Sequence, residues 1–96
     1  MDFFFFARFQ VRAGSEIAAV EALRTVLAPT RAEPGCIGID AFPSKQDPRI
    51  FLIHSRWTNE AAFELHATLP HTVNFIRQME SLVDRPPEFT RTEMIG

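Results

Sequence analysis

The chain has 96 residues, a hydrophobic content of 46% and a formal net charge of −2, which predict one globular domain over residues 1–96 and argue against disorder. The ten basic residues form no run, so nucleic-acid binding is not expected, and no stretch approaches the about 20 apolar residues of a membrane span. With a single cysteine, Cys36, no internal disulfide can form, and we expect a buried thiol in a soluble, cytoplasmic protein.

The aromatic content is unusual in kind, with ten phenylalanines, one tryptophan and no tyrosine. Aromatic surface without phenol groups favours dry surroundings. The composition leaves three such surroundings open, namely the core, a subunit interface and a site for an apolar ligand.

Residues 2–12 alternate between the two faces of a strand and predict the first strand of the fold. Phenylalanine occurs on both faces at its start, where Phe4 and Phe6 lie opposite the row that begins with Phe3 and Phe5. A strand that is apolar on both faces needs cover on both sides. A chain of this length has little left for the second face, so another subunit is expected there.

Residues 16–28 have helical periodicity, and Ser15 is placed to cap their N-terminus. The large apolar side chains expected to face inward are Ile17, Val20, Leu23 and Val26 or Leu27. Pro29 lacks a backbone N–H, so the helix is expected to kink or stop near Ala28, with room for one further turn before Pro34–Gly35.

Two alternating segments, residues 36–42 and 49–57, are separated by a polar turn with two prolines, which predicts an antiparallel hairpin. One face of the second strand carries Phe51, Ile53, Ser55 and Trp57. His54 lies on the opposite face, which we expect to be the subunit side, and its role is interpreted as structural.

A second helix over residues 58–69, capped by Thr58, is followed by a break at Pro70, a further helical pattern over residues 71–83 and a last strand over residues 88–95. The order βαββαβ is that of the α+β, ferredoxin-like split βαβ arrangement, in which helices cover one face of an antiparallel sheet. The open face is expected to be covered by a homodimer that packs sheet on sheet.

Four short motifs resemble those of the antibiotic biosynthesis monooxygenase family. In chain order they are Arg31–Cys36 at a helix-to-strand junction, Asp47–Phe51 and Arg56–Trp57 in the hairpin, and His66 with Pro70–His71 and Phe75. The resemblance extends over nearly the whole chain and implies a dimeric α+β barrel of ferredoxin-like subunits. Oxygenase-type members need no metal or flavin, because the aromatic substrate, ionised as a phenolate or enolate, supplies the electron that activates dioxygen.

The resemblance therefore implies a cofactor-independent monooxygenase acting on a small aromatic, quinol, quinone-like or polyketide-like substrate. His66 is the expected catalytic base, since an imidazole titrates near neutrality, and His71 is expected to be a second polar contact. The side chains expected to bind the aromatic ring are Trp57, Phe5, Phe51 and Phe63. No cofactor or metal is expected, and the two histidines are five residues apart with a proline between them, a poor spacing for a shared ion.

Each of these residues also has an ordinary structural interpretation. The aromatic residues are then core side chains, His66 is a core or pocket-edge histidine, and His71 is a surface or capping residue. Quinol monooxygenase-like members commonly have tyrosine and glutamate where this chain has His54 and Ser55. That departure favours an alternative, a non-catalytic dimeric ligand-binding or stress-related domain of the same fold. A cofactor-free isomerase or decarboxylase is a third interpretation, whereas Ala7, in place of a first-strand asparagine, argues against haem degradation.

Overall fold

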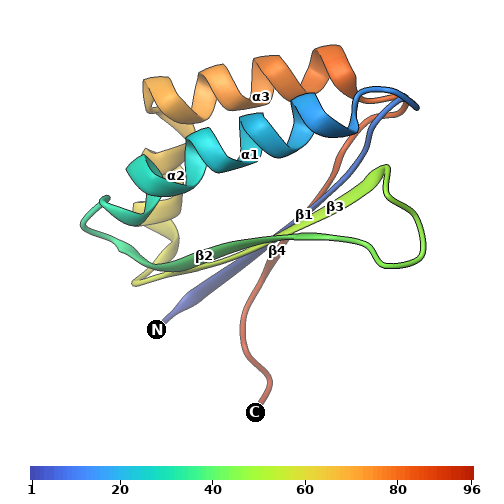
Figure 1. The fold of residues 1–96 in the computed structure, drawn as a ribbon. Helices are drawn as coiled ribbons and strands as arrows, with labels where there is room; N and C mark the ends of the chain where they lie inside the picture. The colour runs from blue at the N-terminus through green and yellow to red at the C-terminus, as the bar shows by residue number, and fades with distance from the viewer.

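The computed structural model describes residues 1–96 as a four-stranded antiparallel sheet with three helices on one face (Figure 1). In chain order the elements are β1 (Phe3–Gln10), α1 (Glu16–Arg31), β2 (Cys36–Pro43), β3 (Ile50–Trp57), α2 (Glu60–Thr68), α3 (Pro70–Leu82) and β4 (Glu88–Thr92). The strand order is β2-β3-β1-β4, which confirms the predicted ferredoxin-like α+β arrangement. None of the helices is both long enough and apolar enough to cross a membrane.

β1 lies in the middle of the sheet, where it pairs with β3 on one side and with β4 on the other. The register sets Phe3 opposite Trp57 and Phe9 opposite Phe51, so the helix-facing rows of the two central strands are aligned. Phe9 and Phe51 belong to the main core, whereas Phe3, Trp57 and Phe63 form a smaller aromatic cluster at the other end of the strands. The alternation in the sequence thus provides an aromatic wall for the helical layer.

α1 does not stop near Ala28 but continues through Pro29 to Arg31, into the further turn for which the sequence left room. The hydroxyl of the fully buried Thr30 donates to the carbonyl of Val26 at 2.7 Å, which adds a hydrogen bond in the turn that contains the proline. Because Pro29 lies in the last turn of the helix, the loss of a single N–H donor there is not sufficient to end it.

The buried face of α1 also differs from the predicted stripe. Ile17 is 77% exposed, whereas Ala19 and Ala22 are buried together with Leu23 and Val26. Small side chains allow a helix to pack closely on its neighbours, and α1 lies beside α3 along most of its length (Figure 1). A stripe read from large apolar residues alone is therefore offset from the face that the fold buries.

A single extended residue, Leu69, separates α2 from α3, because the residue before a proline disfavours helical geometry. The predicted break at Pro70 is thus confirmed, and it turns α2 away from the paired helices α1 and α3 (Figure 1). The cap of α2 is Asn59 rather than Thr58, since the Asn59 side chain accepts a hydrogen bond from the Ala62 N–H at 2.9 Å.

The connection between α1 and β2 is pressed against α2 at Gly35, where an added β-carbon would clash with the β-carbon of Ala62. We expect Gly35→Ala to lower the free energy of unfolding by about 1–3 kcal/mol, because overpacking forces the backbones apart. Urea denaturation measures this change. Gly38→Ala, which places its methyl group in open space, is the matched control, and an equal loss in both variants would contradict the prediction.

β4 ends at Thr92 rather than at Ile95. Thr92 pairs with Phe4, and β1 begins only one residue earlier, at Phe3, so residues after Thr92 have almost no partner strand left. The face of the sheet away from the helices has no cover within the chain (Figure 1). The His54 ring lies on it, 4.9 Å from the ring of Phe6, and therefore on the face opposite Trp57, as predicted.

Candidate active site

A cavity of about 630 Å³ lies between the helix-facing side of the sheet and the helices. Eleven of its sixteen lining residues are hydrophobic, which suits a mainly apolar ligand. The polar lining residues are Thr30, Ser55, His66, Thr72 and Arg91. The site therefore combines a mainly apolar wall with a small set of polar groups, the usual composition of a small-molecule pocket.

His66, in the last turn of α2, is the buried titratable side chain of this cavity. Its Nδ1 lies 2.8 Å from Glu33 Oε2 and 3.1 Å from Thr72 Oγ1. A carboxylate only accepts hydrogen bonds, so Nδ1 carries the hydrogen of the neutral ring and Nε2 carries the lone pair. Nε2 has no hydrogen-bond partner in the chain. Since every fully buried side-chain nitrogen or oxygen does have a partner, Nε2 is accessible, and it opens to the cavity that His66 lines.

The surroundings of His66 favour its neutral form. Burial is the main cause and lowers the pKa of His66, against the hydrogen bond and the charge of Glu33, which act to raise it. His71 adds a smaller lowering contribution to this pKa. A ring that is neutral near pH 7 and presents a free lone pair is suited to accept a proton.

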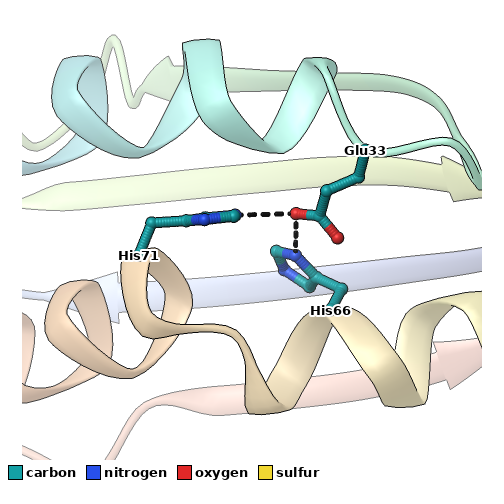
Figure 2. A group of neighbouring side chains, drawn as sticks. All are labelled: Glu33, His66 and His71. Carbon is teal, nitrogen blue, oxygen red and sulfur yellow. Dashed lines mark hydrogen bonds and ion pairs between the residues drawn. The ribbon is translucent and has the colours of Figure 1, made fainter.

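Glu33 holds two histidines at once. Its carboxylate oxygen Oε2 accepts from His66 Nδ1 and, at 2.7 Å, from His71 Nε2 (Figure 2). Glu33 follows the end of α1, and the backbone is fixed there because the Glu33 N–H donates to Thr30 and the Glu33 carbonyl accepts from Cys36. The side chain of Glu33 is 10% exposed.

Sequence reasoning did not identify Glu33 as a site residue. It lies 33 positions before His66, so no local spacing connects the two side chains. The feature of the sequence that could have indicated Glu33 is its position between the end of a helix and the turn at Pro34–Gly35. This turn packs against α2, the helix that carries His66.

His71 does not line the main cavity. It lies in the first turn of α3, where its Nε2 faces Glu33, and it borders a second, more polar cavity of about 560 Å³ between α1 and α3. Glu33 thus connects a histidine of the main cavity with a histidine of the outer one. The next residue after His71, Thr72, does line the main cavity.

Of the aromatic residues proposed to bind the ring, Phe5 and Phe63 line the cavity, whereas Trp57 and Phe51 do not. Phe51 and Trp57 lie at the two ends of β3, and the residues between them that face the cavity are Ile53 and Ser55. Alternation along a strand predicts the face of a side chain but not its depth along the strand. Trp57 and Phe51 therefore lie outside the lining of this cavity, and their contact with a substrate ring stays a prediction.

Trp57 instead packs against the ring of His66. It is fully buried, its ring centroid lies 4.6 Å from that of His66, and its Nε1–H donates to Ser55 Oγ at 3.0 Å. The Ser55 hydroxyl thus accepts a hydrogen bond from the indole and donates one, at 3.5 Å, to the carbonyl of Phe5. The tryptophan ring thus packs against the ring of His66.

The cavity opens beside β4, whose exposed residues Phe89 and Arg91 belong to its lining. Arg91 donates to Glu60 at 2.8 Å and also to Glu64, both on α2, and its guanidinium lies 5.2 Å from the centroid of the Phe63 ring. This ion-paired arginine bridges the edge strand and α2 at the entrance. Nothing in the spacing of the sequence pointed to it.

Comparison with known proteins identifies the family of this chain and supports the assignment of its fold. The family model described as antibiotic biosynthesis monooxygenase matches residues 3–78. Rv0793 of Mycobacterium tuberculosis, which is named as a provisional monooxygenase, is 32% identical over 84 residues, which are 88% of this chain and 82% of that protein. An uncharacterised Synechocystis protein, sll1783, is 31% identical over 65 residues; they make up 68% of this chain and only 44% of that protein's length.

Solved structures show the same fold. The structure of Rv0793 has a TM-score of 0.94 at 27% sequence identity and covers 100% of this chain and 97% of its own. A crystal structure described as an antibiotic biosynthesis monooxygenase has a TM-score of 0.93 at 18% identity, covering 98% of this chain and 99% of that one, and shows the fold alone. The predicted resemblance is confirmed by these matches.

Proposed function

Since this chain belongs to the antibiotic biosynthesis monooxygenase family, we propose that it oxidises a small aromatic, quinol or polyketide-like compound with dioxygen and without a cofactor. The observation that carries the proposal is the unpaired Nε2 of His66, a neutral buried imidazole that opens into an apolar cavity. The cavity volume lies within the range of about 300–1,000 Å³ that is usual for small-molecule sites.

In the first step, Nε2 accepts the proton of the substrate's hydroxyl group. The imidazolium that forms keeps its Nδ1–H on Glu33, whose negative charge stabilises the new positive charge. Trp57 and Thr72 hold the ring of His66 in place during the transfer. The aromatic side chains Phe5 and Phe63 are proposed to contact the substrate ring in the cavity.

The ionised ring then reacts with dioxygen. It passes one electron to O₂, and the aryloxyl radical and superoxide combine at a ring carbon that carries hydrogen, which forms a C–O bond to a peroxide anion. The imidazolium returns its proton to this peroxide. Cleavage of the O–O bond and loss of the ring C–H proton release water and leave a second carbonyl group, so one oxygen atom enters the quinone and the other enters water.

A direct test is oxygen uptake by metal-stripped protein with a panel of hydroxynaphthalenes and hydroquinones, combined with ¹⁸O₂ labelling of the product. The expected result is uptake of one O₂ for each quinone formed, with one labelled oxygen atom in the quinone. Tight binding without oxygen uptake by any compound would overturn the proposal in favour of a non-catalytic binding domain. That alternative is supported by Ser55, because a serine at this position leaves the cavity lining without a carboxylate. Turnover without oxygen would favour an isomerase or decarboxylase.

We further propose that the open face of the sheet is the interface of a homodimer. Exposed apolar side chains of three strands gather there, on β1, β3 and β2, and they are Phe6, Leu52 and Phe42. A sheet face of this kind is stable when it packs on a second sheet.

The interface is tested with Leu52→Glu, which places a charge in the centre of this face. We expect light scattering to give a mass of two chains for the wild type and one chain for the variant. Ile17→Glu, at an exposed apolar residue of α1, is the matched control and should leave the mass unchanged. A monomeric wild type, or a dimeric Leu52→Glu variant, would contradict the proposal.

A further inference from the structure

Glu33, His66 and His71 bring three donor atoms of the kind that bind metal ions into one place. These atoms, one from each side chain, all lie within 4.8 Å of one another. They come from the connection after α1, the last turn of α2 and the first turn of α3, and they converge across the helical layer (Figure 2). The side chains are 10%, 11% and 25% exposed, so the cluster is largely shielded from water.

We propose that this Glu33–His66–His71 cluster binds one divalent transition-metal ion of the Zn²⁺ type. Two imidazole nitrogens and one carboxylate oxygen are a donor set typical of such ions, and three protein ligands leave a coordination position open for water or another oxygen. A further oxygen, Thr72 Oγ1, lies 3.1 Å from His66 Nδ1. The inference is independent of the proposed oxygenase activity, because it rests on the cluster alone.

The distances require only a small adjustment. With metal–ligand bonds of about 2.0–2.1 Å, two donors on a tetrahedral ion lie about 3.4 Å apart. The histidine nitrogens now lie 2.8 and 2.7 Å from Glu33 Oε2, and the two nitrogens are at most 4.8 Å apart. Lengthening each histidine–glutamate contact by about 0.6–0.7 Å, and bringing the two nitrogens to a similar separation, makes room for the ion.

Two features distinguish the cluster from an ordinary histidine–carboxylate pair. One histidine is sufficient for Glu33 to orient a ring, yet a second imidazole from another helix points at the same oxygen atom. Pro70 is what separates the two histidines into different helices and lets them face each other across Glu33. The i, i+5 spacing on one continuous helix would have sent the side chains in different directions.

Metal binding would change the nitrogen that faces the main cavity. In the metal-free state, the hydrogen of the neutral His66 ring is on Nδ1. An ion binds Nδ1 only through a lone pair on that atom, so in the metal-bound state the hydrogen of the neutral ring must be on Nε2. Nε2 then donates instead of accepting, and the metal-loaded protein is unable to take a proton from a substrate in the cavity.

The test is calorimetric titration of metal-stripped protein with ZnCl₂, together with the absorption spectrum of the Co²⁺-substituted protein, both without substrate. We expect one ion for each chain and a Co²⁺ spectrum of low coordination number. His71→Asn and Glu33→Gln should each weaken binding at least tenfold, while His54→Asn, which changes a histidine on the open face, should leave it unchanged.

The result that would overturn the proposal is the absence of a one-to-one site, or wild-type affinity in His71→Asn. Circular dichroism establishes that each variant is folded, and His71, with the most exposed side chain of the three, serves as the test if Glu33→Gln does not fold. Because binding is measured without substrate, its failure leaves the oxygen-uptake result unaffected, and the reverse also holds.

Discussion

The His66→Gln variant is expected to lose turnover of the hydroxyarene by about 10²–10⁴-fold, the usual contribution of a positioned acid–base group. Glutamine keeps an amide donor for Glu33 and much of the volume of the ring, but it has no atom that accepts a proton near neutral pH. The measurement is kcat from initial rates of oxygen uptake at saturating substrate. Binding of the substrate itself should change little, because most of the cavity wall is apolar.

A matched control is His54→Gln, which makes the same chemical change on the other face of the sheet. This variant should keep the wild-type kcat, because the His54 ring contacts Phe4 and Phe6 and is not part of the cavity. Wild-type kcat in His66→Gln would show that another group, or the substrate alone, removes the proton. Reduced kcat in both variants would point to a loss of the fold rather than of a base.

Replacing Trp57 with alanine is expected to lower the free energy of unfolding by about 3–5 kcal/mol, the usual cost of truncating a buried aromatic side chain. Trp57 is fully buried, with ring centroids of Phe63 and His66 at 5.9 and 4.6 Å. The variant leaves a void at this position and removes the hydrogen bond to Ser55. Since small domains have a total stability of about 5–15 kcal/mol, a large part of it is lost.

Urea denaturation followed by circular dichroism measures this loss, because the variant has no tryptophan fluorescence. Leu52→Ala, on the exposed face, is the comparison and should cost much less when measured at concentrations where the protein is monomeric. If Trp57→Ala cost no more than Leu52→Ala, the tryptophan would not be a packing residue. Trp57→Phe should recover part of the stability, because the phenylalanine ring refills much of the void.

Much of the fold follows from local features of the sequence. The alternation of β1 and of the hairpin, the break at Pro70 and the order of the elements together predict the ferredoxin-like arrangement. These features act over a few residues, through strand pleating and the missing N–H of proline, and so they are readable without tertiary contacts. Where local rules compete, as at Pro29, the additional hydrogen bond of Thr30 belongs to the folded helix and decides the outcome.

The residues of the site also divide into those that local periodicity predicts and those that it does not. His66, Phe5 and Phe63 were predictable as inward-facing residues, because the periodicity of a helix or strand sets the face of a side chain. Periodicity does not set the depth of a side chain along the strand, so it does not show that Trp57 and Phe51 lie outside the cavity lining. It also carries no information on which inward-facing side chain contacts which.

By itself, the sequence determined the order of the elements, the two faces of the sheet and a histidine turned toward its helical side. Only the tertiary structure decided that Glu33 meets His66 and His71, since a contact between residues 33 and 38 positions apart arises from packing α1 against the broken helix. That packing depends on the arrangement of the sheet and all three helices together. It fixes which nitrogen of His66 is free, and with it both the proposed base and the proposed metal site.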